Sequence, residues 1–446
     1  MSCSRIGPAR ITACALGFRT LRELEFHHSH AMPGLRLGLT HPLLDRHRAP
    51  PDDSLRFAAA AAALGVLLGD QWEERTYFSA CEPAVAVMLL HFAASTTAEV
   101  PWLEIDIDGI LDEPLDTRVR HVRVTNRHGL SAVPDNFFFR DLRPLAVDLS
   151  ALRGVLSVGA WFLKGCHFVR YIDMTALAEV TNVDVGFLAD CAALRELDLR
   201  PMQSLVEVDD NFLAGCESLT DVRLPPFDGL AKVPSQFLHN CSHLPFIDLG
   251  ALKGVTTIGA DFLSNCGLLC SLDVSPLANV KDVGQIFLRR CASLSSLDLR
   301  PMYSITAVGD SFLAECTGLE TVTLGSWPLA TIPDRFLAKC SRLAALDMSP
   351  LTAVRVVRGW FATGCDSLTS VDFTAFGNVA SVGDSFLSQC TSLAAVDLRP
   401  LASLRSVGGM FLSGCYHLRS LDLPRTRLRT AGRSFLGGCS KLQRVA

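Results

Sequence analysis

Residues 291–315 read CASLSSLDLRPMYSITAVGDSFLAE, and units of this kind recur to the end of the sequence. Twelve cysteines mark the recurrence: nine of the eleven gaps between them are 25 residues long, and the other two are 24. A phenylalanine stands four residues before each of these cysteines. Self-similarity at a fixed period of this length indicates a repeat architecture, in which each unit forms one structural turn. The ladder consists of Phe162, Cys166, Phe187, Cys191, Phe212, Cys216, Phe237, Cys241, Phe262, Cys266, Phe287, Cys291, Phe312, Cys316, Phe336, Cys340, Phe361, Cys365, Phe386, Cys390, Phe411, Cys415, Phe435 and Cys439.

Each position of the unit has a physical role. In the run from Leu297 to Leu299, apolar and polar residues alternate, which predicts a short strand with one buried face. A proline follows in several units and would end the strand, because proline cannot donate to a sheet ladder. Phe and Cys four residues apart would share one face of a helical turn. An Asp or Ser before that turn is typical of a helix cap, and we expect this role for Asp310, Asp334, Asp384 and Ser235.

One such unit cannot bury its apolar surface alone, whereas stacked units can. We therefore predict an α/β solenoid with short parallel strands on its concave face and short helical turns on its convex face. The repeat array covers residues 117–446 in about 13 units. Phe137 extends the ladder one unit upstream, where Asp141 replaces the cysteine.

The pattern Leu-x-x-Leu-Asp-Leu…Val-Gly-Asp-x-Phe-Leu-x-x-Cys resembles the BspA-like class of leucine-rich repeat proteins. The resemblance covers about three quarters of the chain. It implies a leucine-rich repeat solenoid and a role in binding proteins or cell surfaces, and it implies no chemistry. Two features depart from the family pattern: most units here have 25 residues rather than 23, and nothing matches the cap of a secreted protein.

A second, longer period lies on top of the first. Arg-Pro-Met at residues 200–202 recurs at 300–302, and Arg-Pro-Leu follows at 399–401. A block of four units, about 100 residues, was therefore duplicated. Some of the similarity between units is then inherited and not required by the fold.

The ladder cysteines have two readings. Free cysteine is among the most buried residue types, so we expect reduced thiols in the core. Disulfides or a metal remain an alternative, because stacked side chains about 5 Å apart fall within disulfide Cα distances. Zinc sites commonly use closely spaced cysteine pairs, and the one close pair here is Cys266 and Cys270.

An aspartate column occupies one position of the predicted strands, facing the concave surface. One reading is a docking stripe for a basic partner segment, and the other is a solvated edge inherited by duplication. Arg223 and Thr323 interrupt the column, and small residues precede most of its members. The candidate partner-binding residues are Asp148, Asp173, Asp198, Asp248, Asp273, Asp298, Asp347, Asp372, Asp397 and Asp422.

Residues 1–116 are not repeats. Residues 1–50 hold several arginines and histidines and form either a loop-like connector or a targeting segment; mitochondrial import is one possibility. Residues 51–116 are expected to form a helical cap region, with helices over 55–68 and 84–92. This cap would cover the first edge of the solenoid.

The composition excludes several classes of protein. Apolar residues make up 49% of the 446, which excludes a disordered chain, and a net charge of −5 gives no sign of nucleic-acid binding. We find no catalytic motif and expect no enzyme activity, cofactor or membrane span. The predicted function is a non-enzymatic, intracellular scaffold, most consistent with the cytoplasm, that binds protein on its concave face. Two alternatives are a substrate adaptor whose N-terminal helices recruit an enzyme, and a structural subunit of a large organelle assembly.

The C-terminal end of the array is basic. Between Tyr416 and residue 446 there are six arginines and Lys441 against Asp422 alone. Leu442 and Val445 are expected to begin another strand. This edge would either be protected by its charge or pair with a second copy or an acidic partner.

Overall fold

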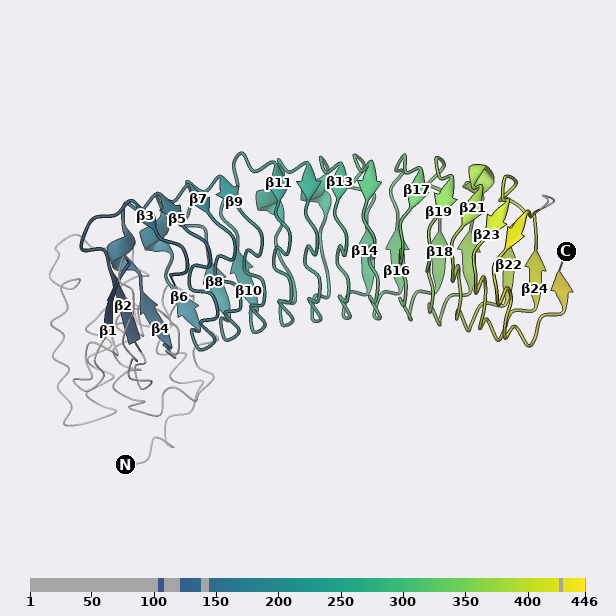
Figure 1. The fold of residues 1–446 in the computed structure, drawn as a ribbon, viewed down its shortest axis with the longest axis horizontal. Helices are drawn as coiled ribbons and strands as arrows, with labels where there is room; N and C mark the ends of the chain where they lie inside the picture. Colours follow the sequence, from purple (N-terminus) through teal and green to yellow (C-terminus); the bar gives the residue numbers. More distant parts are fainter. Residues whose placement is uncertain (1–102, 108–120, 138–143, 425–427, 446) are drawn as a thin grey trace, which may run out of the picture. The chain divides into compact units, whose positions relative to one another are not determined.

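A computed structural model describes residues 103–107, 121–137, 144–424 and 428–445 (Figure 1). The chain divides into two compact units. The first comprises Met1–Arg127, Asp141–Leu152 and Val169–Asp173, and the second comprises His128–Arg140, Arg153–Phe168 and Met174–Ala446. The arginine- and histidine-containing segment 1–50 and both expected helices of the cap region lie outside the described residues.

The first unit holds one four-stranded parallel sheet. Its order is β1 (Leu103–Asp106), β2 (His121–Thr125), β4 (Ala146–Asp148) and β6 (Tyr171–Ile172), followed after β4 by the 3₁₀ turn η4 (Ser150–Leu152). Strand β1 lies within residues 51–116, the region that the sequence predicts to be a helical cap, so residues 103–106 of that region are extended and not helical. The run Leu-Glu-Ile-Asp alternates apolar and acidic residues, and it pairs in register with β2.

The second unit is a stack of coils, each coil being one 24–25-residue repeat, and most of the coils hold two short strands. The three-residue strands end at the aspartate column, and we call their surface the aspartate face. They are β8 (Glu196–Asp198), β10 (Asp221–Arg223), β14 (Ser296–Asp298), β16 (Thr321–Thr323), β18 (Ala345–Asp347), β20 (Ser370–Asp372), β22 (Ala395–Asp397) and β24 (Ser420–Asp422). The sequence predicted these strands. It also predicted a strand at the end of the array, and β26 (Arg444–Val445) forms there beside β24.

The sequence did not predict a second column of strands, in the Val-Gly half of each coil. We call its surface the short-strand face (Figure 1). Its members pair in longer runs than the three-residue strands do, up to five strands in one sheet. They are β3 (Ala132–Val133), β5 (Ser157–Val158), β7 (Asn182–Val183), β9 (Glu207–Val208), β11 (Lys232–Val233), β12 (Thr257–Ile258), β13 (Asp282–Val283), β15 (Ala307–Val308), β17 (Thr331–Ile332), β19 (Val356–Val357), β21 (Ser381–Val382), β23 (Ser406–Val407) and β25 (Thr430–Ala431).

The short helix predicted over Phe-Leu-x-x-Cys is absent. The backbone of this segment instead alternates in handedness: φ is positive at Asp261, Leu263 and Asn265 in one coil, and the same positions repeat along the stack. The Asp261 amide donates to a carbonyl of the next coil, and the Leu263 amide donates to Phe237 of the preceding one. Alternation turns successive amides toward opposite neighbours, whereas a helix would keep its hydrogen bonds within the segment. Helical turns in the second unit are 3₁₀ and follow the aspartate position: η5 (Thr175–Leu177), η6 (Gly250–Leu252), η7 (Ser275–Leu277) and η8 (Phe376–Asn378).

The predicted helix-capping aspartates link adjacent coils instead. Oδ1 of Asp310 accepts the Asp334 amide at 3.0 Å, and Oδ1 of Asp334 accepts the Gly359 amide at 2.7 Å. Asp384 likewise accepts the Gly409 amide at 2.6 Å. Ser235 is a donor in the same series, since its amide donates to Asp210 at 2.6 Å. Each carboxylate therefore satisfies a backbone donor of the following coil.

The core runs along the stack as two parallel rows. Ladder rings of successive coils stack in parallel from Phe137 to Phe435, with centroids 5.1–6.2 Å apart. Beside them the cysteines from Cys166 to Cys415 are buried, and Cys439 is half-buried. Each thiol from Cys191 to Cys439 donates to a carbonyl of the preceding coil; the Sγ of Cys291, for example, lies 3.3 Å from the carbonyl oxygen of Leu263. The predicted Phe–Cys ladder is thus the shared core of the coils.

Candidate interaction surface on the aspartate face

The aspartate face presents its column toward solvent in the middle of the second unit. Asp248, Asp273, Asp298, Asp347 and Asp372 are exposed, as is Asp397, while Asp198 and Asp422 are half-buried. Paired strands place successive members side by side, so that Asp347 faces Asp372 and Asp397 faces Asp422. Arg223 stands beside Asp198 in the same register, and Thr323 beside Asp298.

These aspartates have a local structural role that the sequence reasoning missed. Oδ1 accepts the backbone amide two residues ahead, at 2.9 Å from Asp273 to Ser275 and 2.8 Å from Asp347 to Ser349. Such an Asx turn reverses the chain where the strand ends. The sequence signal was present, because Asp at a strand end followed by Pro, Gly, Ser or Thr is turn chemistry. The same bond forms at Asp148, Asp198, Asp248, Asp298, Asp372 and Asp397.

Three members of the column also hold an arginine at a spacing of four coils. The guanidinium of Arg200 lies 2.6 Å from Asp198, and those of Arg300 and Arg399 lie 2.7 Å from Asp298 and Asp397. These are the arginines of the Arg-Pro-Met and Arg-Pro-Leu motifs that recur about every 100 residues. They neutralise their aspartates, and hydrogen bonds from Arg300 and Arg399 lower the pKa values of Asp298 and Asp397. At Asp198 burial raises the pKa, but the bonds from Arg200 outweigh it and the net shift is downward.

Unpaired negative charge on the exposed part of the column is therefore confined to four positions. Asp248 and Asp273 form one pair of neighbouring coils, and Asp347 and Asp372 form the other; none of them makes an ion pair with a described lysine or arginine. Hydrogen bonds from Ser275 lower the pKa of Asp273, which keeps that carboxylate ionised. The column is thus two acidic patches, separated by the Asp298–Arg300 pair and Thr323.

Phe246 projects from the first acidic patch. It occupies the position two residues before Asp248, where the following coils carry Ser271, Ser296 and Thr321, and 57% of its side chain is exposed. Leu268, in the turn before Ser271 of the following coil, is 50% exposed. Among the described residues, the coils around Phe246 and Ser271 form no strand on this face, so the ladder is interrupted there.

The first two members of the column differ from the rest. Asp148 is buried, and its Oδ2 accepts Nε of Arg123 at 3.1 Å within the sheet of the first unit. Arg123 also lies 3.8 Å from Glu104 on β1. Asp173 follows β6 and is half-buried. These two positions do not offer the exposed carboxylates found from Asp248 onward.

The ladder cysteines in the described coils are free thiols. Burial raises the pKa of Cys266, Cys291 and Cys340, to about 12 for Cys266, so these thiols stay protonated. Cys270 differs from the buried Cys266. It is exposed on the loop before the aspartate face, and its thiol donates to the carbonyl oxygen of Pro245. No group of three or more His, Cys, Asp or Glu residues in the described part of the chain could hold a metal ion.

One side-chain trio combines a serine, a histidine and an acid. The Ser264 hydroxyl donates to Oδ1 of Asp261 at 3.0 Å and lies 2.6 Å from Nδ1 of His239. Ser264 is 1% exposed, and the acid binds the serine and not the far nitrogen of the histidine. The arrangement joins two coils and offers no accessible nucleophile, unlike a catalytic triad, in which the acid orients the histidine.

The part of the chain that is similar to known proteins is the repeat array. Residues 157–294, 206–344, 256–374 and 354–446 match the BspA type leucine rich repeat region, in six copies. Since these matches span more than half of the sequence, the chain belongs to the BspA-type leucine-rich repeat family. The fold class, a leucine-rich repeat solenoid, is confirmed. No curated protein matches the chain.

Two solved structures that the chain resembles are bacterial proteins. A leucine-rich repeat protein from Bacteroides ovatus is 20% identical over 65% of this chain, with a TM-score of 0.41; the match spans 58% of that protein. A leucine rich cell surface protein from Faecalibacterium prausnitzii is 18% identical over 69% of this chain and 80% of its own, with a TM-score of 0.43. The family is a class of non-enzymatic repeat scaffolds that bind proteins or surfaces. No described helix is long and apolar enough to cross a membrane.

Proposed function

We propose that this protein is a non-enzymatic, intracellular scaffold that binds a basic segment of a protein partner on the aspartate face. The binding region is centred on Phe246 and the acidic patch of Asp248 and Asp273, and it extends to the patch of Asp347 and Asp372. The observation that carries the proposal is the exposure of Phe246 at a position that holds a small residue in every later coil, from Ser271 to Ser420, and Tyr171, Glu196 and Asp221 in the three coils before it. Binding energy concentrates in aromatic anchors, and charges around an anchor select the partner.

The spacing of the two patches sets the length of the partner. Asp248 and Asp347 are four coils apart, which is about 19 Å at a strand spacing near 4.8 Å. An extended segment of about six residues spans this distance. We therefore expect a partner segment with an apolar or aromatic residue for Phe246 and lysines or arginines toward both ends.

Selection from a random peptide display library tests the proposal on the full chain. Enriched peptides should combine basic residues with one or two apolar ones. Replacing Asp248, Asp273, Asp347 and Asp372 by Asn removes four charges and keeps the oxygen that accepts the turn amide. That variant should bind the selected peptides at least tenfold more weakly, with a shallower salt dependence.

A matched variant distinguishes the effect of charge at the proposed site from the effect of the net charge of the whole protein. Glu179→Gln with Asp228→Asn, Asp282→Asn and Asp366→Asn removes the same charge from exposed positions away from the aspartate face. Its peptide binding should equal that of the wild type. Equal weakening by both variants, or no enrichment of basic peptides, would contradict the proposed site and favour the reading of the column as a solvated edge.

The adaptor alternative depends on residues 51–116 and the organelle alternative on residues 1–50. Apart from residues 103–107, these segments lie outside the described residues, and both alternatives stay predictions.

A further inference from the structure

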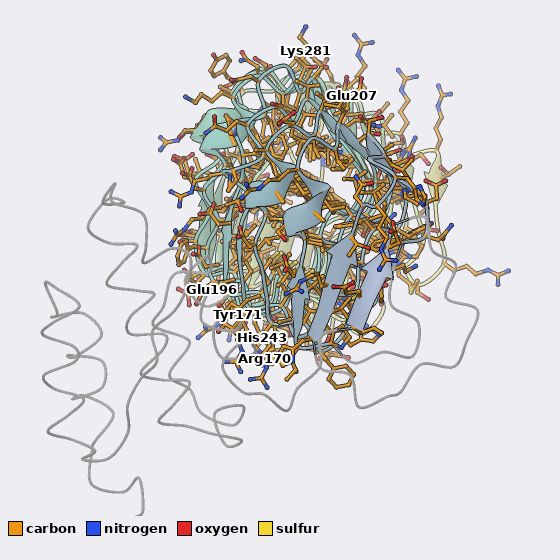
Figure 2. The ribbon with its side chains drawn as sticks, turned by 90° about the vertical axis from the view of Figure 1, so that its left-hand side faces the viewer. Arg170, Tyr171, Glu196, Glu207, His243 and Lys281 are labelled. Atoms are coloured by element: carbon orange, nitrogen blue, oxygen red, sulfur yellow. The ribbon has the colours of Figure 1, made fainter. Side chains whose placement is uncertain are left out.

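The short-strand face carries opposite charge at its two ends. Figure 2 shows Glu207 and Lys281, which belong to this face, on the side of the coils opposite to Glu196 and His243. The charged residues in the coils of β7 and β9 themselves are acids, because residues 174–194 and 201–211 contain no lysine or arginine; the coils on either side carry the exposed Arg153 and Lys232. We call this set the acidic zone: Glu179, Asp184, Glu207, Asp209 and Asp210.

The other end is basic. Beside β19, β23 and β25 stand five exposed arginines, and Asp384 is the one acid among them on this face. Of the five, Arg358 makes an ion pair, at 3.8 Å from Asp310. We call this set the basic zone: Arg355, Arg358, Arg405, Arg429 and Arg433. Between the zones the face is balanced, with Lys232, Lys253 and Lys281 against Asp228, Asp282 and Asp310.

This segregation does not stabilise the single chain. From the coil of Asp184 to that of Arg405 there are nine coils, or about 43 Å at 4.8 Å per coil. Charges so far apart are screened at physiological salt, where the Debye length is about 8 Å. Within each zone, neighbouring like charges repel. The attraction between the zones is available only if another surface brings opposite charges together.

We propose that the short-strand face is the interface of a two-fold symmetric dimer with a second copy of this chain. A two-fold axis through the balanced middle would lay the acidic zone of each copy on the basic zone of the other, twice in one interface. The face suits such contact because its central part includes the small, exposed residues Thr256, Thr306 and Ala307, which would let the backbone of a second copy approach closely. Val206, 44% exposed beside the acidic zone, adds an apolar contact.

The size of the face predicts how strong the dimer is. Eleven coils by about three strand residues give roughly 500 Å² per copy, or about 1,000 Å² in all. That lies at the lower limit for a specific interface. We expect a dimer with a dissociation constant in the micromolar range that depends on salt.

Sedimentation of the full chain tests the dimer. At 50 mM salt a monomer–dimer equilibrium should be seen, and at 500 mM the dissociation constant should rise at least tenfold. Arg355→Glu with Arg405→Glu in the basic zone should abolish self-association, as should Glu179→Arg with Glu207→Arg in the acidic zone. Lys339→Glu with Arg342→Glu changes the net charge as the first pair does, but at exposed positions on other faces, and it should leave the dimer intact.

Mixing the two zone variants makes the test specific. Each repels itself, yet a mixed pair has complementary zones at both ends, so an equimolar mixture should recover a dimer with one copy of each. Recovery also shows that both variants are folded. A monomer at 50 mM salt and 100 μM chain, a dimer that is insensitive to both zone variants, a mixture that stays monomeric, or an open-ended series of oligomers would each overturn the proposal.

Discussion

Replacing Phe262 by alanine tests whether the aromatic ladder holds the coils together. The Phe262 ring is fully buried, and its centroid lies 5.9 Å from that of Phe237 and 5.6 Å from that of Phe287. Removing a buried phenylalanine ring costs about 3–5 kcal/mol in lost transfer energy and cavity. Two stacked neighbours lose a partner as well, at about 0.5–1.5 kcal/mol each. We expect Phe262→Ala to lower the free energy of unfolding by about 4–8 kcal/mol.

Chemical denaturation of the full chain, followed by circular dichroism, measures this change. The chain offers a matched control in Phe246, which is 57% exposed. Phe246→Ala makes the same chemical change at the surface and should stay within about 0.5 kcal/mol of the wild type. If the two variants unfold at the same denaturant concentration, the stacked ladder does not stabilise the coils and the reasoning is wrong.

Three further outcomes follow from the contacts between coils. In the native chain at pH 7.5, Cys270 should react with a thiol reagent well before Cys266 and the other buried ladder cysteines, as mass spectrometry would show; native disulfides between coils would contradict this. Because the pKa of Cys266 is raised from its ordinary value of 9.0 to about 12, its thiol stays protonated in the fold and ionises on unfolding. The free energy of unfolding should therefore be steady below pH 9 and fall between pH 9 and 12, and an increase over that range would refute the burial argument. Asp334→Ala leaves the Gly359 amide without its acceptor and should cost about 1–3 kcal/mol in thermal unfolding, whereas Asp334→Asn, which keeps an acceptor oxygen, should cost less; equal losses would point to charge and not to the hydrogen bond.

The repeat architecture was predictable from the sequence because its signal is repeated a dozen times. The spacing of Phe and Cys fixes which residues of successive coils stack, and the structure confirms that register from Phe137 to Phe435. The alternation around Leu297 likewise predicted the three-residue strands. Each of these inferences depends on the burial of apolar side chains, which leaves a clear periodic pattern.

The errors concern backbone hydrogen bonds, which leave a weaker pattern. Phe and Cys at a spacing of four fit a helix, but the same spacing fits a backbone of alternating handedness whose amides bind both neighbouring coils, as at Leu263. Asp310 has the chemistry of a helix cap, yet its amide partner belongs to the next coil, 24 residues ahead. The turn role of Asp273 was also missed. A column of repeated negative charge suggested binding of a partner, whereas each carboxylate also accepts a backbone amide two residues ahead, as Asp273 does from Ser275.

Hydrogen exchange with a selected basic peptide bound to the full chain tests most directly where the protein binds its partner. The account predicts slower exchange on binding in residues 244–250, 269–275, 344–349 and 369–374, with no change along the short-strand face around β13 and β19. Protection confined to the short-strand face or to the Phe-Leu-x-x-Cys turns, with the aspartate face unchanged, would contradict it.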